Sequence, residues 1–111
     1  MRFAISVFAA ASVLALGAPA SAEVSDQDYI QASRCAAIAR SSKFKSPDLQ
    51  AFKAFLESEE EGRTITTRRR ADMAASLAKQ EALTASGEKK AALEAELSGA
   101  CQAFKLQLAG N

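Results

Sequence analysis

Apolar residues recur at helical spacing along most of the chain, and the pattern is strongest near the C-terminus. One side of a predicted helix there carries Leu93, Leu97, Ala100, Cys101, Phe104 and Leu108. Intervals of three and four residues match the 3.6-residue period of an α-helix and give it one apolar face. We therefore predict a helix over 93–108 with Cys101 in the middle of its buried side.

A second helical pattern covers 26–42. Ser25 can cap this helix with its hydroxyl, and Asp26 and Asp28 favour the positive helix end. One side of it carries Tyr29, Ala32, Cys35, Ala36 and Ala39, with Ile38 at the margin. Small alanines allow a neighbouring helix to pack closely, and Cys35 is expected on the buried side.

The pair Ser46-Pro47 predicts the start of another helix. Serine is a favoured N-cap, and proline at the first helical position loses no hydrogen bond because that N–H would be unpaired anyway. Asp48 follows in the first turn, and the helix should end before Gly62. Its apolar face is a compact stripe of Leu49, Phe52, Phe55 and Leu56. We interpret the stripe as core, and the alternative is a client-binding surface formed by Phe52 and Phe55.

Thr64 or Thr66 can cap a further helix that continues toward Ser86. Its apolar face is thinner, with Ile65, Met73, Leu77 and Leu83 separated by Gln80 and many alanines. Ser86-Gly87 favours a break before the last helix, although the helix could continue through the glycine at a cost of about 1 kcal/mol. No segment shows strand alternation. The prediction is an all-α domain, an up-and-down bundle of four helices, or three if two of them merge.

The first 22 residues have the pattern of a secretory signal peptide. Arg2 supplies a positive charge, 3–16 is uncharged and apolar, and Ala20-Ser21-Ala22 is a small-residue cleavage site. The apolar part is nearer the roughly 7–15 residues of a signal than the roughly 20 of a spanning helix. We predict that 1–22 is cleaved, and that 23–111 is a single helical domain, periplasmic or secreted, without stable membrane insertion. An uncleaved membrane anchor is the alternative.

Export changes the chemistry expected of the two cysteines. An even pair in an oxidising compartment predicts one disulfide, Cys35 to Cys101, whose two cysteines stand 66 positions apart. Closing a loop of that length stabilises a fold by about 4 kcal/mol in the chain-entropy model. Removal of the leader leaves 89 of the 111 residues, a size at which a core is marginal without such a bond. A redox-active pair is the alternative, but the Cys-x-x-Cys spacing is absent.

Composition excludes several classes of function. The chain has no histidine, the commonest near-neutral acid or base and the commonest metal ligand. Loss of Arg2 with the leader takes one of the 14 basic residues and leaves 13, which balance the 13 acidic ones. This neutrality argues against nucleic acid as a partner. With no phosphate loop, metal-ligand spacing or paired nucleophile and base, we expect neither enzymatic activity nor a metal or cofactor.

Two charge runs are the candidate binding residues. Glu57, Glu59, Glu60 and Glu61 end one predicted helix, and Arg68, Arg69 and Arg70 begin the next. Each run opposes the dipole of its helix, but a hairpin at Gly62 would bring the two together. They form either a solvated, self-neutralising tip or a docking surface for carboxylates or phosphates. Two copies of the chain could also pair through the complementary runs, which would give a homo-oligomer.

The sequence predicts a small exported helical protein that binds an unknown protein in the envelope or outside the cell, as an adaptor, inhibitor or accessory subunit. One alternative is an acid- or stress-responsive periplasmic chaperone that exposes its apolar helices. The layout resembles that of small periplasmic acid-stress chaperones in general architecture, without a shared motif. Another alternative is an envelope-associated structural protein whose helix 93–108 rests on a membrane, although Cys101 on that face favours burial.

Overall fold

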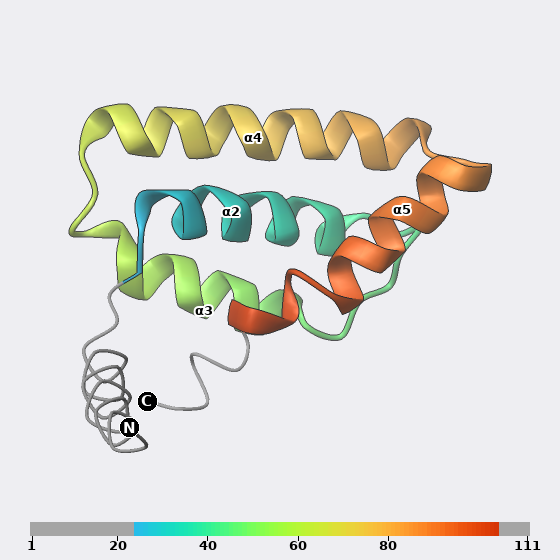
Figure 1. Cartoon of the computed structure of the whole chain (residues 1–111), viewed down its shortest axis with the longest axis horizontal. Coiled ribbons are helices and arrows are strands. Elements are labelled where there is room, and N and C mark those ends of the chain that lie inside the picture. Colours follow the sequence, from blue (N-terminus) through green and yellow to red (C-terminus); the bar gives the residue numbers. More distant parts are fainter. Residues whose placement is uncertain (1–23, 105–111) are drawn as a thin grey trace, which may run out of the picture.

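The computed structural model describes residues 24–104, which contain four helices and no strand. These helices are α2 (Asp26–Arg40), α3 (Leu49–Glu60), α4 (Ile65–Thr84) and α5 (Gly87–Ser98). In Figure 1, α2 lies between α3 and α4, and α5 leads obliquely back from the far end of α4. The predicted all-α bundle is confirmed. The predicted leader at 1–22 and Leu108 lie outside the described residues.

The start of α2 is set by a reciprocal cap. The Ser25 hydroxyl accepts a hydrogen bond from the Asp28 N–H at 3.1 Å, and the Asp28 carboxylate accepts one from the Ser25 N–H at 3.4 Å. The five residues predicted to face the core are buried: Tyr29, Ala32, Cys35, Ala36 and Ala39. Ile38, expected at the margin, is fully buried. The central position of α2 in the bundle explains this wider buried face.

The prediction of the start of α3 is wrong by a few residues. Its N-cap is Asp48, and the Ser46 hydroxyl instead accepts a hydrogen bond from the Asp48 N–H at 3.2 Å, within the preceding turn. Phe52 and Phe55 are buried, and the Phe55 ring centroid lies 5.1 Å from that of Phe104. The interpretation of the aromatic stripe as core is therefore confirmed.

Helix α4 packs against α2 through its small residues. The N-cap is Thr64, one of the two predicted candidates, and its hydroxyl accepts a hydrogen bond from the Thr67 N–H. The buried side consists of Thr67, Ala71, Ala78 and Ala82. The thinner apolar face that the sequence indicates for this helix, formed by Ile65, Met73, Leu77 and Leu83, points away from the core, because all four side chains are 57–65% exposed. Alanines on both α2 and α4 let the two helices approach closely, and that contact leaves no room for longer side chains.

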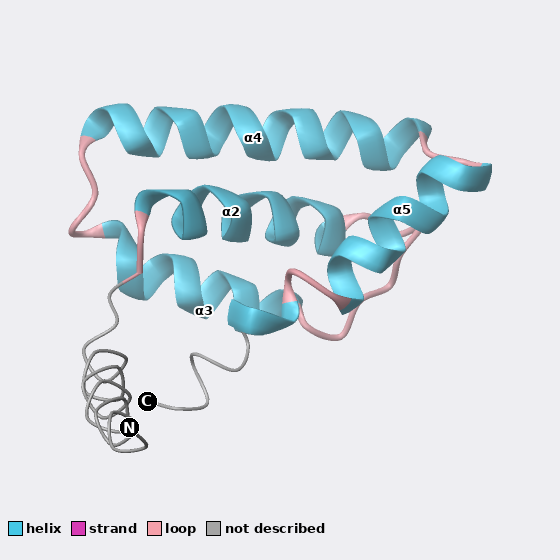
Figure 2. Ribbon diagram, viewed as in Figure 1, coloured by secondary structure: helices cyan, strands magenta, loops and turns pink. Residues whose placement is uncertain are grey.

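The connection between α2 and α3, which can be followed in Figure 2, contributes a side chain that caps the C-terminal end of α4. The Lys43 ammonium donates hydrogen bonds to the carbonyl oxygens of Leu83 at 2.7 Å and Ala85 at 3.0 Å. These carbonyls belong to the helix end, where no intrahelical N–H is available to them. A basic side chain from another segment therefore supplies the C-terminal cap.

The last predicted helix is interrupted. The break at Ser86-Gly87 is confirmed, and Gly87 has φ +57°, a backbone conformation that favours glycine. The expected continuous helix over 93–108 is wrong, because α5 ends at Ser98 and the chain turns at Gly99. A Cβ at Gly99 would lie 2.9 Å from the backbone oxygen of Ala95. Leu93, Leu97, Cys101 and Phe104 are buried as predicted, whereas Ala100 is exposed.

The predicted disulfide joins α2 to the turn after α5. Cys35 and Cys101 form the bond with a Cα–Cα distance of 5.8 Å, and both residues are fully buried. It lies inside the core cluster rather than at its edge. No helix in the described part of the chain is both long enough and apolar enough to cross a bilayer.

Candidate functional site

The predicted Glu/Arg tip lies where α3 turns into α4. Across the turn, Arg68 Nη1 lies 3.8 Å from Glu60 Oε2, and both side chains are about half exposed. Among the described residues this is the only ion pair that joins the two runs. An exposed pair of this kind contributes about 0–1 kcal/mol. The two runs therefore form an ion pair at one point only; within residues 24–104, the exposed Glu61, Arg69 and Arg70 form no ion pair within 4.0 Å.

Arg63 makes the main electrostatic contacts of the turn, a role that no pattern in the sequence indicates. Its guanidinium contacts the carboxylate of Asp26 at 2.9 Å, that of Glu59 at 3.0 Å and the carbonyl of Val24 at 2.8 Å. It also lies 5.5 Å from the centroid of the Tyr29 ring, within the range of a cation–π contact. Its side chain is only 11% exposed. Glu59 is a local partner four residues earlier, but only the tertiary approach of the α2 N-terminus to the 61–64 turn brings the Asp26 carboxylate and the Val24 carbonyl to this arginine.

Asp26 connects that cluster to α4. Its second carboxylate oxygen accepts a hydrogen bond from the Thr67 hydroxyl at 3.0 Å. The hydrogen bonds from Arg63 and then from Thr67 hold the pKa of Asp26 below its ordinary value of 3.8. Burial alone would lower the pKa of Arg63, but its bonds to Asp26 and Glu59 outweigh that effect and raise it. The fold therefore stabilises the charged form of both side chains relative to the neutral form.

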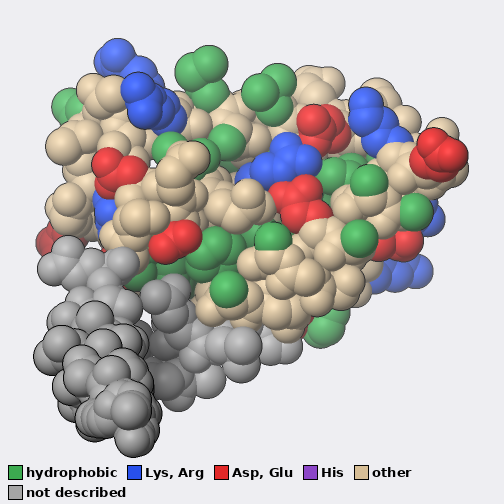
Figure 3. All heavy atoms as spheres, viewed as in Figure 1, with side chains coloured by type: hydrophobic (Ala, Val, Ile, Leu, Met, Phe, Trp, Pro, Cys, Tyr) green, Lys and Arg blue, Asp and Glu red, His purple; other side chains and the backbone are tan. Residues whose placement is uncertain are grey.

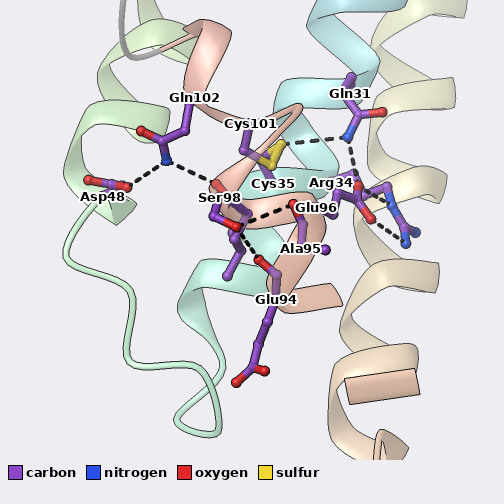
Figure 4. The surroundings of a disulfide bond; sticks show 11 residues. Gln31, Arg34, Cys35, Asp48, Glu94, Ala95, Glu96, Ser98, Cys101 and Gln102 are labelled. Atoms are coloured by element: carbon purple, nitrogen blue, oxygen red, sulfur yellow. Dashed lines mark hydrogen bonds and ion pairs between the residues drawn. A yellow bond between two sulfur atoms is a disulfide. The ribbon is translucent and has the colours of Figure 1, made fainter. Parts of the chain in front are cut away.

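A second charge cluster surrounds Arg34, beside the disulfide (Figure 4). The Arg34 guanidinium binds Glu96 of α5 through Nε at 2.7 Å and Nη2 at 3.1 Å, and Glu81 of α4 through Nη2 at 2.6 Å. Gln31 donates to the same Glu96 carboxylate at 2.7 Å. The bond to Glu96 is the main cause that raises the pKa of Arg34. One residue of α2 therefore anchors both α4 and α5.

Sulfur and carboxylate groups come together at this point without forming a convincing metal site. The Glu96 carboxylate and the sulfurs of Cys35 and Cys101 lie within 4.8 Å of one another. Metal ligation by cysteine requires thiolates, which the disulfide does not offer. The guanidinium of Arg34 already occupies the carboxylate. The arrangement is suited to holding helices together.

The outward side of α4 carries the large apolar residues that the core excludes. Ile65, Arg69, Met73 and Leu77 follow one another at intervals of four, and so form a single row along the helix. Figure 3 shows hydrophobic side chains along the edge formed by α4, with basic ones gathered at its N-terminal end. Single exposed apolar residues are ordinary, but several on one helix face form an uncommon surface for a small protein. We call these four residues the α4 row.

A hollow of about 610 Å³ lies between α2 and α4 beside this row. Its walls include the basic residues Arg40 and Lys79 and the acidic residue Asp72. Leu83, one of the four exposed apolar residues of α4, also lines it. The hollow therefore extends the exposed side of α4 toward the C-terminal half of α2.

The other predicted binding residues are not on the surface. Phe52 is fully buried and Phe55 nearly so, which means that client binding through them would require the bundle to open. Leu93, Leu97 and Phe104 are likewise in the core, so the apolar side of α5 is occupied by the protein itself.

Comparison of this chain with known protein families, with curated proteins and with solved structures finds no match.

Proposed function

We propose that this chain is a small exported protein that acts by binding another protein, as an adaptor, inhibitor or accessory subunit, through the outward side of α4. The observation that carries the proposal is the α4 row together with Leu83. Four large apolar side chains on this helix are 57–65% exposed, while its alanines fill the contact with α2.

The proposed location is the periplasm or the outside of the cell. Its basis is the signal-like pattern of residues 1–22 and the buried Cys35–Cys101 bond. Bonds of that kind persist mainly in oxidising compartments. The position of the disulfide also leaves α4 free of covalent constraint on its outward side.

The test is affinity purification from the native envelope. The mature, oxidised protein is used as bait, and a discrete partner is identified by mass spectrometry. The double variant Met73→Asp with Leu77→Asp should lose that partner while it keeps the helical circular dichroism of the parent, because both positions are exposed. Ala92→Asp, at an exposed position of α5, is the matched control and should retain the partner.

A parallel variant tests the predicted basic run. Arg68→Glu, Arg69→Glu and Arg70→Glu together should also lose the partner, and Lys89→Glu on α5 should not. Retention of the partner by both α4 variants would remove α4 from the proposal.

A second candidate function is the acid-responsive chaperone, and the positions of the carboxylates favour it. Asp26 connects the start of α2 to the 61–64 turn and to α4, and Glu81 and Glu96 connect α4 and α5 to Arg34. Protonation of these groups in acid would weaken contacts between elements and could expose Phe52 and Phe55. The test is suppression of client aggregation at about pH 2–3, below the ordinary carboxyl pKa values. Absence of suppression there removes this candidate.

A further inference from the structure

One member of the α4 row is a cation set among apolar neighbours. Arg69 lies one helical turn after Ile65 and one turn before Met73, both of which are more than 60% exposed. Within the described residues, no carboxylate lies within 4.0 Å of the Arg69 guanidinium. A partner that covers Ile65 and Met73 must therefore cover this charge as well.

The surroundings of the row are basic. Arg70 follows directly, and the hollow beside α4 adds Arg40 and Lys79 against a single acidic residue, Asp72. Of the acidic run on α3, Glu60 faces Arg68 rather than the row. The chain as a whole is close to neutral, so this basic excess is local to the outward side of α4.

We infer that the α4 row binds an amphipathic helix of a partner protein, one whose apolar face carries a carboxylate. The inference rests on the proposed function and specifies the chemistry of the partner. Desolvating a guanidinium without a counter-charge is costly, whereas a carboxylate can accept two parallel hydrogen bonds from it. The row together with Leu83, from Ile65 to Leu83, spans about 27 Å, because a helix rises about 1.5 Å per residue, and a helix of about 18 residues would cover that length.

A second copy of the chain is a poorer occupant. An antiparallel pair of α4 helices centred on the midpoint of the helix would set Arg69 against Gln80, and Arg70 against Lys79. In this register each helix presents the same side to the other, and no carboxylate lies opposite Arg69. Charge complementarity therefore favours a different, acidic protein.

The test uses two synthetic amphipathic peptides of about 18 residues that differ at one position. One has a glutamate in the centre of its leucine face, and the other has a lysine there. Each is titrated into the mature, oxidised protein labelled at the methionine methyl groups, and binding is followed by NMR. The glutamate peptide should shift the Met73 signal and bind at least about tenfold more tightly than the lysine peptide.

Variants make the charge dependence specific to one residue. Arg69→Glu should invert the preference so that the lysine peptide binds more tightly, and Arg69→Gln should bring the two affinities within about threefold. Lys89→Glu, an equal charge reversal on α5, should keep the parent preference. Position 69 is exposed, and circular dichroism will show that each variant keeps its helices.

Three results would overturn the inference. The first is equal affinity for the two peptides, and the second is binding without a shift of the Met73 signal. The third is a dimer, detected by sedimentation, that the Met73→Asp, Leu77→Asp variant no longer forms. Binding to vesicles containing phosphatidylglycerol that Arg69→Glu abolishes, with no preference between the peptides, would assign the row to a membrane surface instead. If an envelope partner is lost from the Met73→Asp, Leu77→Asp bait yet the peptides bind equally, only the inferred partner chemistry fails. If no partner depends on α4, the proposed function fails.

Discussion

Arg34 of α2 and Glu96 of α5 form a two-point ion pair, with Nε–Oε2 at 2.7 Å and Nη2–Oε1 at 3.1 Å. The pair lies directly beside the Cys35–Cys101 bond, and the same guanidinium reaches Glu81 of α4. The covalent and the ionic attachment of α5 to α2 thus occur at one place. Three helices meet there through a single charged residue.

Arg34→Met should destabilise the fold by about 2–3 kcal/mol. The substitution leaves Glu81 and Glu96, which are only partly exposed, facing each other without a cation. Urea denaturation measures the change. Arg40→Met, at an exposed position at the end of the same helix, should stay within about 0.5 kcal/mol of the parent. Similar losses in the two variants would contradict the anchoring role of Arg34.

Replacement of both cysteines by alanine should cost about 4 kcal/mol, because the sequence separation they close is 66. Guanidinium denaturation of the oxidised parent and of the double variant provides the comparison. A difference below about 1 kcal/mol would mean that the unfolded chain is already compact, so that the crosslink restricts it little.

Asp26 should make the free energy of unfolding depend on pH below its ordinary pKa of 3.8. Its pKa is lowered in the fold, so its contribution is fully present above 3.8, the ordinary value, and is lost as the pH falls through the lower folded value. Asp26→Asn should therefore show a weaker decline in unfolding free energy below about pH 4 than the parent. Thr67→Val removes one of the two hydrogen bonds and should give an intermediate decline. Identical pH profiles for the parent and Asp26→Asn would refute this role.

The two sides of α4 should respond to size in opposite ways. Ala78→Leu should destabilise the fold by about 1–3 kcal/mol or more, because Ala78 is fully buried in the close contact with α2. Leu77→Ala, one residue away and 61% exposed in the parent, should change stability by less than about 0.5 kcal/mol. Thermal or urea unfolding measures the stability of the two variants. A larger loss for Leu77→Ala than for Ala78→Leu would mean that α4 packs with its other face toward α2.

Local signals made most of the helices predictable. The caps at Ser25 and Thr64 and the break at Ser86-Gly87 lie where the sequence indicates them, because each depends on chemistry within four residues. The burial of Phe52 and Phe55 was predictable for a similar reason, because the helical spacing of the apolar residues is enough to give that helix one apolar side. The pairing of Cys35 with Cys101 followed from their number and helical phase.

Contacts between residues far apart in the sequence could not be predicted from such local signals. Arg63 has the sequence surroundings of an ordinary turn residue, and only the fold brings Asp26 to it from 37 positions away. Arg34 and Glu96 are 62 positions apart, and nothing in the sequence distinguishes them from the other charged residues. The helical period also failed at Gly99, where a turn that glycine permits brings Cys101 and Phe104 into the core.

The sequence by itself determined the all-helical class, the boundaries set by local caps and the two cysteines that form the crosslink. Those features depend on the period of the backbone and on neighbours a few residues away. The tertiary structure decided which side of α4 is buried. The sequence pattern marks Ile65, Met73, Leu77 and Leu83 as the apolar face of this helix, yet close packing against the alanines of α2 selected the small residues for the core and left the large ones outside. That steric choice creates the exposed row on which the proposed function depends.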